Sequence, residues 1–89
     1  MSTPTSAEVL SRLVAFDTTS CNSNLPLIDY VADYLAALGI ESHRIFDATG
    51  QKANLWATIG PADVPGTILS GHTDTVPVTG QEWTSDPFT

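Results

Sequence analysis

A histidine and an aspartate with one residue between them form the pattern in this chain that is best suited to chemistry. The segment SGHTDTVP at residues 70–77 contains His72 and Asp74. If the backbone is extended through Thr73, the alternation along a strand directs both side chains to the same side. An imidazole nitrogen is a common ligand of divalent metal ions, and a nearby carboxylate either binds the same ion or holds the other ring N–H. We favour the second arrangement, with His72 as the metal ligand and Asp74 supporting its ring.

The His-x-Asp triplet is weak evidence for a metal site by itself. In a chain with two histidines and seven aspartates it arises by chance about one time in six or seven. A hydrolytic zinc site needs about three protein ligands and an open position. The other histidine, His43, is interpreted as an ordinary strand residue, and Cys21 has no neighbouring base to activate it as a nucleophile. The chain therefore does not easily complete a metal site from its own residues.

Composition excludes several classes of function. The 89 residues carry a net charge of −7, and so acidic a surface repels phosphate backbones and anionic lipid headgroups. We therefore expect no nucleic-acid and no membrane partner. A single cysteine allows no internal disulfide, which favours the reducing cytoplasm. With 42% hydrophobic and 15% charged residues, the chain is too apolar to be disordered, although its core must be small.

Two helices are predicted in the first half of the chain. Thr5 and Glu8 have capping-box spacing before a helix that ends near Phe16. Its apolar residues recur at helical spacing at Val9, Leu10, Leu13 and Phe16. A polar loop follows, and Asn24 is the predicted cap of a second helix that Gly39 terminates. The apolar stripe of this second helix comprises Leu27, Ile28, Val31, Leu35 and Leu38, while Asp29 and Asp33 lie on its solvated side.

Three strands are predicted after Gly39, at residues 40–47, 54–59 and 67–70. The segment 60–66 has two prolines and two glycines, which is typical of a surface connection. The predicted strand at residues 67–70 is short, and its two central residues are apolar. We therefore expect it inside a sheet that is covered on both sides, in an α/β fold. His72 and Asp74 would then follow the carboxyl end of a strand, where ligands bind in such sheets.

Two segments resemble a known enzyme family. SGHTDTVP at 70–77 and EWTSDPF at 82–88 are similar to the co-catalytic zinc amidohydrolases and peptidases, which include desuccinylases and aminoacylases. The shared Gly-His-x-Asp-x-x-Pro core matches Gly71, His72, Asp74 and Pro77. Thr75 and the Trp-x-x-Asp-Pro-Phe pattern are typical of the acetylornithine deacetylase branch, and the resemblance covers essentially the whole chain.

The resemblance implies specific roles and a fold. His72 corresponds to a ligand of one of two zinc ions, with cobalt as a possible substitute, and Asp74 to the catalytic aspartate that supports it. Residues 1–89 correspond to the N-terminal portion of the catalytic domain, with two helices followed by strands of a mixed sheet that helices cover. The general base and the other metal ligands belong to a second block of the family that this chain does not contain, so we expect the chain alone to be inactive.

The implied reaction is hydrolysis of the N-acetyl amide of N2-acetylornithine to ornithine and acetate, in arginine biosynthesis. The implied substrate is a small N-acyl amino acid. The resemblance also implies that the complete enzyme is a homodimer, and that its dimerisation domain is not part of residues 1–89. Related desuccinylase, aminoacylase or dipeptidase activities are alternatives. A different class of function is also open, in which the chain is non-catalytic and associates through an exposed sheet edge.

Overall fold

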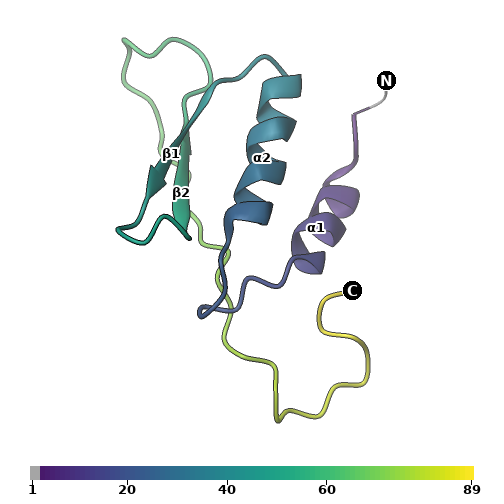
Figure 1. Cartoon of the computed structure of the whole chain (residues 1–89). Helices are drawn as coiled ribbons and strands as arrows, with labels where there is room; N and C mark the ends of the chain where they lie inside the picture. Colours follow the sequence, from purple (N-terminus) through teal and green to yellow (C-terminus); the bar gives the residue numbers. More distant parts are fainter. Residues whose placement is uncertain (1–2) are drawn as a thin grey trace.

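The fold consists of two helices and a β-hairpin, followed by a long segment without regular structure. The computed structural model describes residues 3–89, with helices α1 (Ser6–Ala15) and α2 (Leu25–Ala37) and strands β1 (Ser42–Phe46) and β2 (Ala53–Ala57). Figure 1 shows α2 between the hairpin and α1, and the chain after the hairpin running away from these elements. The α/β composition expected from the sequence is therefore confirmed.

Helix α1 begins as the sequence predicts. The hydroxyl oxygen of Thr5 accepts a hydrogen bond from the amide of Glu8 at 3.2 Å, which satisfies one of the free N–H groups of the first turn. The helix ends at Ala15, one residue before the predicted end. Its apolar side is only half-buried and Leu10 is 61% exposed, so α1 contributes less to the core than its spacing suggests.

Helix α2 has the predicted position, but the side chain of its N-cap residue is not used as a cap. Asn24 is the N-cap residue, yet its side chain makes no capping bond. Instead its amide nitrogen donates to the carbonyl of Ala53 at 2.9 Å, and its amide oxygen accepts from the N–H of Ala53 at 3.0 Å. These two bonds fasten the start of α2 to the start of β2. At the other end Gly39 has φ +78°, the left-handed conformation predicted for a residue that ends a helix.

Strands β1 and β2 form an antiparallel pair in which Phe46 is opposite Ala53 and His43 is opposite Trp56. Ala53 is buried, and alternate residues along β2 are half-buried, whereas Asn54 and Trp56 on the other face are exposed. This alternation is the period of two of a sheet with one covered face. Helix α2 provides that cover.

The core is small and centred on α2. Its buried residues are Leu27, Ile28 and Ala53, with Leu13, Phe16, Leu25, Val31 and Leu55 packed around them. Leu38, which the sequence places in the apolar stripe of α2, is 53% exposed because it follows the last helical residue. Asp29 is exposed as expected and also forms an ion pair with Arg44 of β1 at 2.9 Å. Exposed pairs of this kind contribute about 0–1 kcal/mol.

The expectation of a covered strand at residues 67–70 is wrong. This segment is not a strand, and Ile68 and Leu69 are 71% and 93% exposed. A strand needs a neighbouring backbone about 4.8 Å away, and within residues 3–89 the sheet consists only of β1 and β2. The sheet is therefore antiparallel and two-stranded, not mixed. The radius of gyration, 15.1 Å, exceeds the value of about 12 Å for a compact domain of this length.

Neither helix in residues 3–89 has the length and apolar character needed to cross a membrane.

The loop after α1 folds around the carboxylate of Asp17. One oxygen of Asp17 accepts hydrogen bonds from the hydroxyl of Thr19 at 2.6 Å and from its amide at 3.1 Å. These two bonds stabilise the ionised form and lower the pKa of Asp17 below its ordinary value of 3.8. Thr18 and Thr19 are buried, at 5% and 7% exposure, so this turn has a defined conformation.

Replacing Leu27 by alanine should destabilise the fold, because Leu27 is 2% exposed at the centre of a small core. We expect a loss of about 2–3 kcal/mol in the free energy of unfolding, measured by urea denaturation. Leu10→Ala is the matched control, since Leu10 is 61% exposed, and it should cost well under about 1 kcal/mol. Equal losses for both variants would contradict the placement of the core.

Replacing Thr19 by valine should raise the pKa of Asp17 toward 3.8, because the hydroxyl bond that chiefly lowers it is lost. A lowered carboxyl pKa contributes stability above the unfolded value, and that contribution is lost as the pH falls through the folded pKa. The Asp17 turn is thus expected to loosen below about pH 4 in the native chain. Carboxyl chemical shifts followed by NMR measure this, and Thr49→Val, which removes a bond to Asp47, should leave Asp17 unchanged.

Candidate functional site

The segment that carries His72 and Asp74 is held in place by the loop after α1. The amide of Thr75 donates to the carbonyl of Thr18 at 3.1 Å, and the amide of Ser20 donates to the carbonyl of Thr75 at 3.0 Å. These bonds make a parallel bridge between Thr19 and Thr75. In addition, the hydroxyl of Thr18 donates to the carbonyl of Thr73 at 2.6 Å. Figure 1 shows the segment after the hairpin passing this loop before it continues to the C-terminus.

The bridge gives His72 and Asp74 the relationship that the sequence predicts. Nδ1 of His72 lies 2.8 Å from Oδ1 of Asp74. An ionised carboxylate has no proton to donate, so Nδ1–H is the donor and the lone pair of Nε2 is available on the other side of the ring. This is the arrangement in which a carboxylate fixes the tautomer of a metal-binding histidine.

The electrostatics of the pair favour an ionised Asp74. The hydrogen bond from His72 is the main cause that lowers the pKa of Asp74 below 3.8, and a bond from Ser20 adds to it. Both side chains are largely exposed, with 85% of His72 and 63% of Asp74 accessible to solvent. Asp74 is therefore a carboxylate acceptor across the neutral range, on an open surface.

Ser20 also belongs to this site, although its spacing in the sequence gave no sign of it. Its hydroxyl lies 3.4 Å from Oδ2 of Asp74 and 3.0 Å from the carbonyl oxygen of Thr75. The two residues are 54 positions apart, and the polar segment that contains Ser20 indicated only a loop. Only the packing of that loop against Thr75 brings them together.

The described residues do not bring together a complete set of metal ligands. Within residues 3–89 no three His, Cys, Asp or Glu side chains are placed to hold a metal ion together. His43 lies on β1 and Cys21 is exposed in the loop after α1. The free Nε2 of His72 is chemically suited to a divalent ion, but a hydrolytic zinc site needs about three protein ligands.

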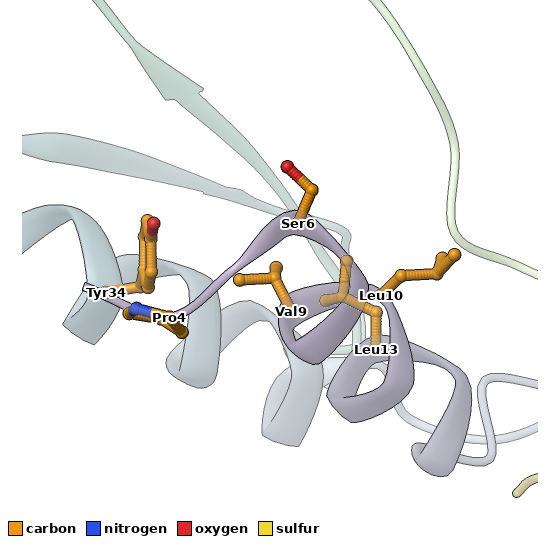
Figure 2. Close-up of a pocket in the computed structure, with 6 residues that line it drawn as sticks. All are labelled: Pro4, Ser6, Val9, Leu10, Leu13 and Tyr34. Carbon is orange, nitrogen blue, oxygen red and sulfur yellow. The ribbon is translucent and has the colours of Figure 1, made fainter. Parts of the chain in front are cut away.

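Two hollows of the surface lie away from this pair. One, of about 290 Å³, is mainly apolar and is formed between α1 and α2, as Figure 2 shows. It is lined by Pro4, Ser6, Val9, Leu10, Leu13 and Tyr34. A wider one, of about 620 Å³, lies between the end of α2 and β1. Neither includes His72 or Asp74, whose side chains are largely exposed to solvent.

The chain is similar in sequence to several curated proteins that share one name, acetylornithine deacetylase. The chain is 40% identical to acetylornithine deacetylase of Proteus mirabilis, with 97% of this chain and 24% of the relative covered. It is 37% identical to acetylornithine deacetylase of Pasteurella multocida, covering 96% and 24%. With acetylornithine deacetylase of Yersinia pseudotuberculosis it shares 42% identity over 84% of this chain and 21% of the relative.

Other comparisons add nothing to these relatives, since no protein-family model and no solved structure matches the chain. The chain spans about a quarter of the length of the curated relatives that it matches. The alignment with the Proteus mirabilis protein nevertheless takes in 97% of this chain. Over nearly its own length the chain is thus similar to acetylornithine deacetylases.

Proposed function

We propose that this chain provides the His72 and Asp74 part of a metal-dependent amidohydrolase that cleaves the N-acetyl amide of N2-acetylornithine to ornithine and acetate. The observation that carries the proposal is the bond between Nδ1 of His72 and Asp74, in a chain homologous to acetylornithine deacetylases. The proposal includes a small N-acyl amino acid as substrate, a homodimeric complete enzyme and a cytoplasmic location.

His72 would bind one of two zinc or cobalt ions through Nε2, because Nδ1 is occupied by Asp74. Asp74 would act through the ring, since a carboxylate on Nδ1–H fixes the tautomer and increases the basicity of Nε2. A bound ion of this kind supplies Lewis acidity that makes water a nucleophile near neutral pH. The loop after α1 contributes by holding the backbone on both sides of Asp74, through its bonds to Thr73 and Thr75.

The other ligands and the general base would come from regions of the relatives that the chain does not match. This accounts for the absence, within residues 3–89, of a three-residue cluster able to hold a metal ion. The chain by itself is therefore expected to bind zinc weakly and to give no turnover of N2-acetylornithine. The test needs the rest of a relative to complete the site.

A chimera provides this test. Residues 1–89 replace the aligned segment of the Proteus mirabilis acetylornithine deacetylase, and metal content and hydrolysis of N2-acetylornithine are measured. We expect an active chimera in which His72→Ala reduces turnover about 1000-fold and lowers bound metal, since a lost ion removes several kcal/mol of transition-state stabilisation. Asp74→Asn should reduce turnover about 10- to 100-fold, the usual effect of losing the partner of a ligating histidine.

His43→Ala is the matched control in the chimera, because it removes the other histidine, which lies on β1 away from the site. It should leave metal content and turnover near the level of the parent chimera. If His72→Ala kept both its metal and its turnover, the assignment of His72 as a ligand would be wrong. Comparing acetylated with succinylated substrates in the same assay separates deacetylase from desuccinylase activity.

A second candidate function, association without catalysis, is favoured by one specific feature. The segment around Leu69, which is 93% exposed, presents apolar side chains and an unpaired backbone to solvent. Unpaired extended segments of this kind pair with other chains.

Association of this kind predicts concentration-dependent oligomers of the chain in sedimentation velocity. Leu69→Lys should weaken them, because a charge on the contact surface opposes association. Leu10→Lys is the matched control, since it changes an exposed leucine of α1 and should leave the distribution unchanged. A chain that stays monomeric at high concentration would eliminate this candidate.

A further inference from the structure

The Asp74 carboxylate has two partners, and the second one is not explained by the His-x-Asp pattern. Oδ1 accepts the bond from His72 at 2.8 Å, while Oδ2 faces the hydroxyl of Ser20 at 3.4 Å. A carboxylate held through both oxygens is restricted in its rotation about the Cβ–Cγ bond. With 63% of its side chain exposed, Asp74 has little other packing to restrict that rotation.

The hydroxyl of Ser20 has one proton and two nearby acceptors. The carbonyl oxygen of Thr75, at 3.0 Å, already accepts the backbone N–H of Ser20. The carboxylate of Asp74 is ionised, and bonds to ionised acceptors are about twice as strong as neutral ones. The hydroxyl has both acceptors within reach, and its bond to the charged acceptor strengthens as the carboxylate approaches it.

Ser20 is itself well fixed. Its amide is bonded to Thr75, and its carbonyl accepts a hydrogen bond from the ammonium group of Lys52, just before β2. The preceding residues are buried and bonded to Thr73 and Thr75. The hydroxyl of Ser20 therefore projects from a defined backbone toward Asp74.

From this geometry we propose that Ser20 is a positioning residue, which holds the Asp74 carboxylate in the orientation that keeps the proton of His72 on Nδ1 and leaves Nε2 free. The inference rests on the proposed function for its consequence, the readiness of Nε2 to bind a metal ion. The contacts that link Ser20 through Asp74 to His72 do not require a metal ion. They are therefore tested in the metal-free protein.

The test is the tautomer of His72, read from two-bond ¹⁵N–¹H correlations of the metal-free chain at about pH 9, where imidazole is neutral. The chain has only two histidines, so His43 on β1 is an internal reference. In the native chain Nδ1 of His72 should resonate as a protonated nitrogen. In Ser20→Ala the ratio of the Nδ1–H to the Nε2–H form should fall about two- to fivefold, the effect of losing one modest hydrogen bond.

Two further variants separate positioning from a merely structural effect. Ser20→Thr keeps the hydroxyl at an exposed position and should restore the native ratio. Ser70→Ala removes a hydroxyl two residues before His72 and should leave the ratio unchanged. Protection of the Thr75 amide from hydrogen exchange is measured in each variant, and it should persist in Ser20→Ala because the backbone bonds to Thr18 and Ser20 remain.

An unchanged His72 tautomer in Ser20→Ala, with Thr75 still protected, would overturn the inference. So would a change of the same size in Ser70→Ala, or a failure of Ser20→Thr to restore the ratio. A loss of Thr75 protection in Ser20→Ala would also count against it, by showing that Ser20 supports the bridge and not the carboxylate. None of these outcomes depends on turnover or metal content, so a failure here is distinct from a failure of the proposed function.

Discussion

The arrangement of the candidate site depends on the parallel bridge between the loop after α1 and the segment 73–75. Two backbone bonds and the hydroxyl bond from Thr18 join residues that are more than 50 positions apart. These bonds fix the direction in which the segment after the hairpin passes the loop. The bridge holds the backbone at Thr75, next to Asp74, and Nδ1 of His72 lies 2.8 Å from Oδ1 of Asp74.

This loop is itself built from short polar side chains. The Asp17 carboxylate organises the turn through Thr19, while buried Thr18 directs its hydroxyl outward to Thr73. Short hydroxyl side chains suit such a place because they bond neighbouring backbone groups at little cost in side-chain entropy. The same composition that indicates an irregular loop therefore also makes the loop a specific docking surface.

The rest of the molecule divides into a packed part and an open part. Leu27, Ile28 and Ala53 form a core between α2 and the hairpin, and the paired bonds of Asn24 with Ala53 fasten that unit. Beyond the hairpin the apolar side chains around Leu69 are exposed. The candidate site lies on the boundary between these parts, held from the packed side by the loop and open to solvent on the other.

The sequence by itself determined the local features of this protein. Capping at Thr5, the left-handed turn at Gly39 and the pairing of His72 with Asp74 all depend on neighbours within a few residues, and each was predictable from spacing. The resemblance to zinc amidohydrolases also depends on short segments, at residues 70–77 and 82–88. Tertiary structure decided the contacts across long distances: Asn24 bonded to Ala53, Ser20 facing Asp74, and residues 67–70 exposed where a covered strand was expected. The physical reason is that a strand forms only when another part of the chain pairs with it, and a carboxylate gains a second partner only when a distant residue packs against it. The spacing of residues in the sequence does not indicate which part of the chain that is.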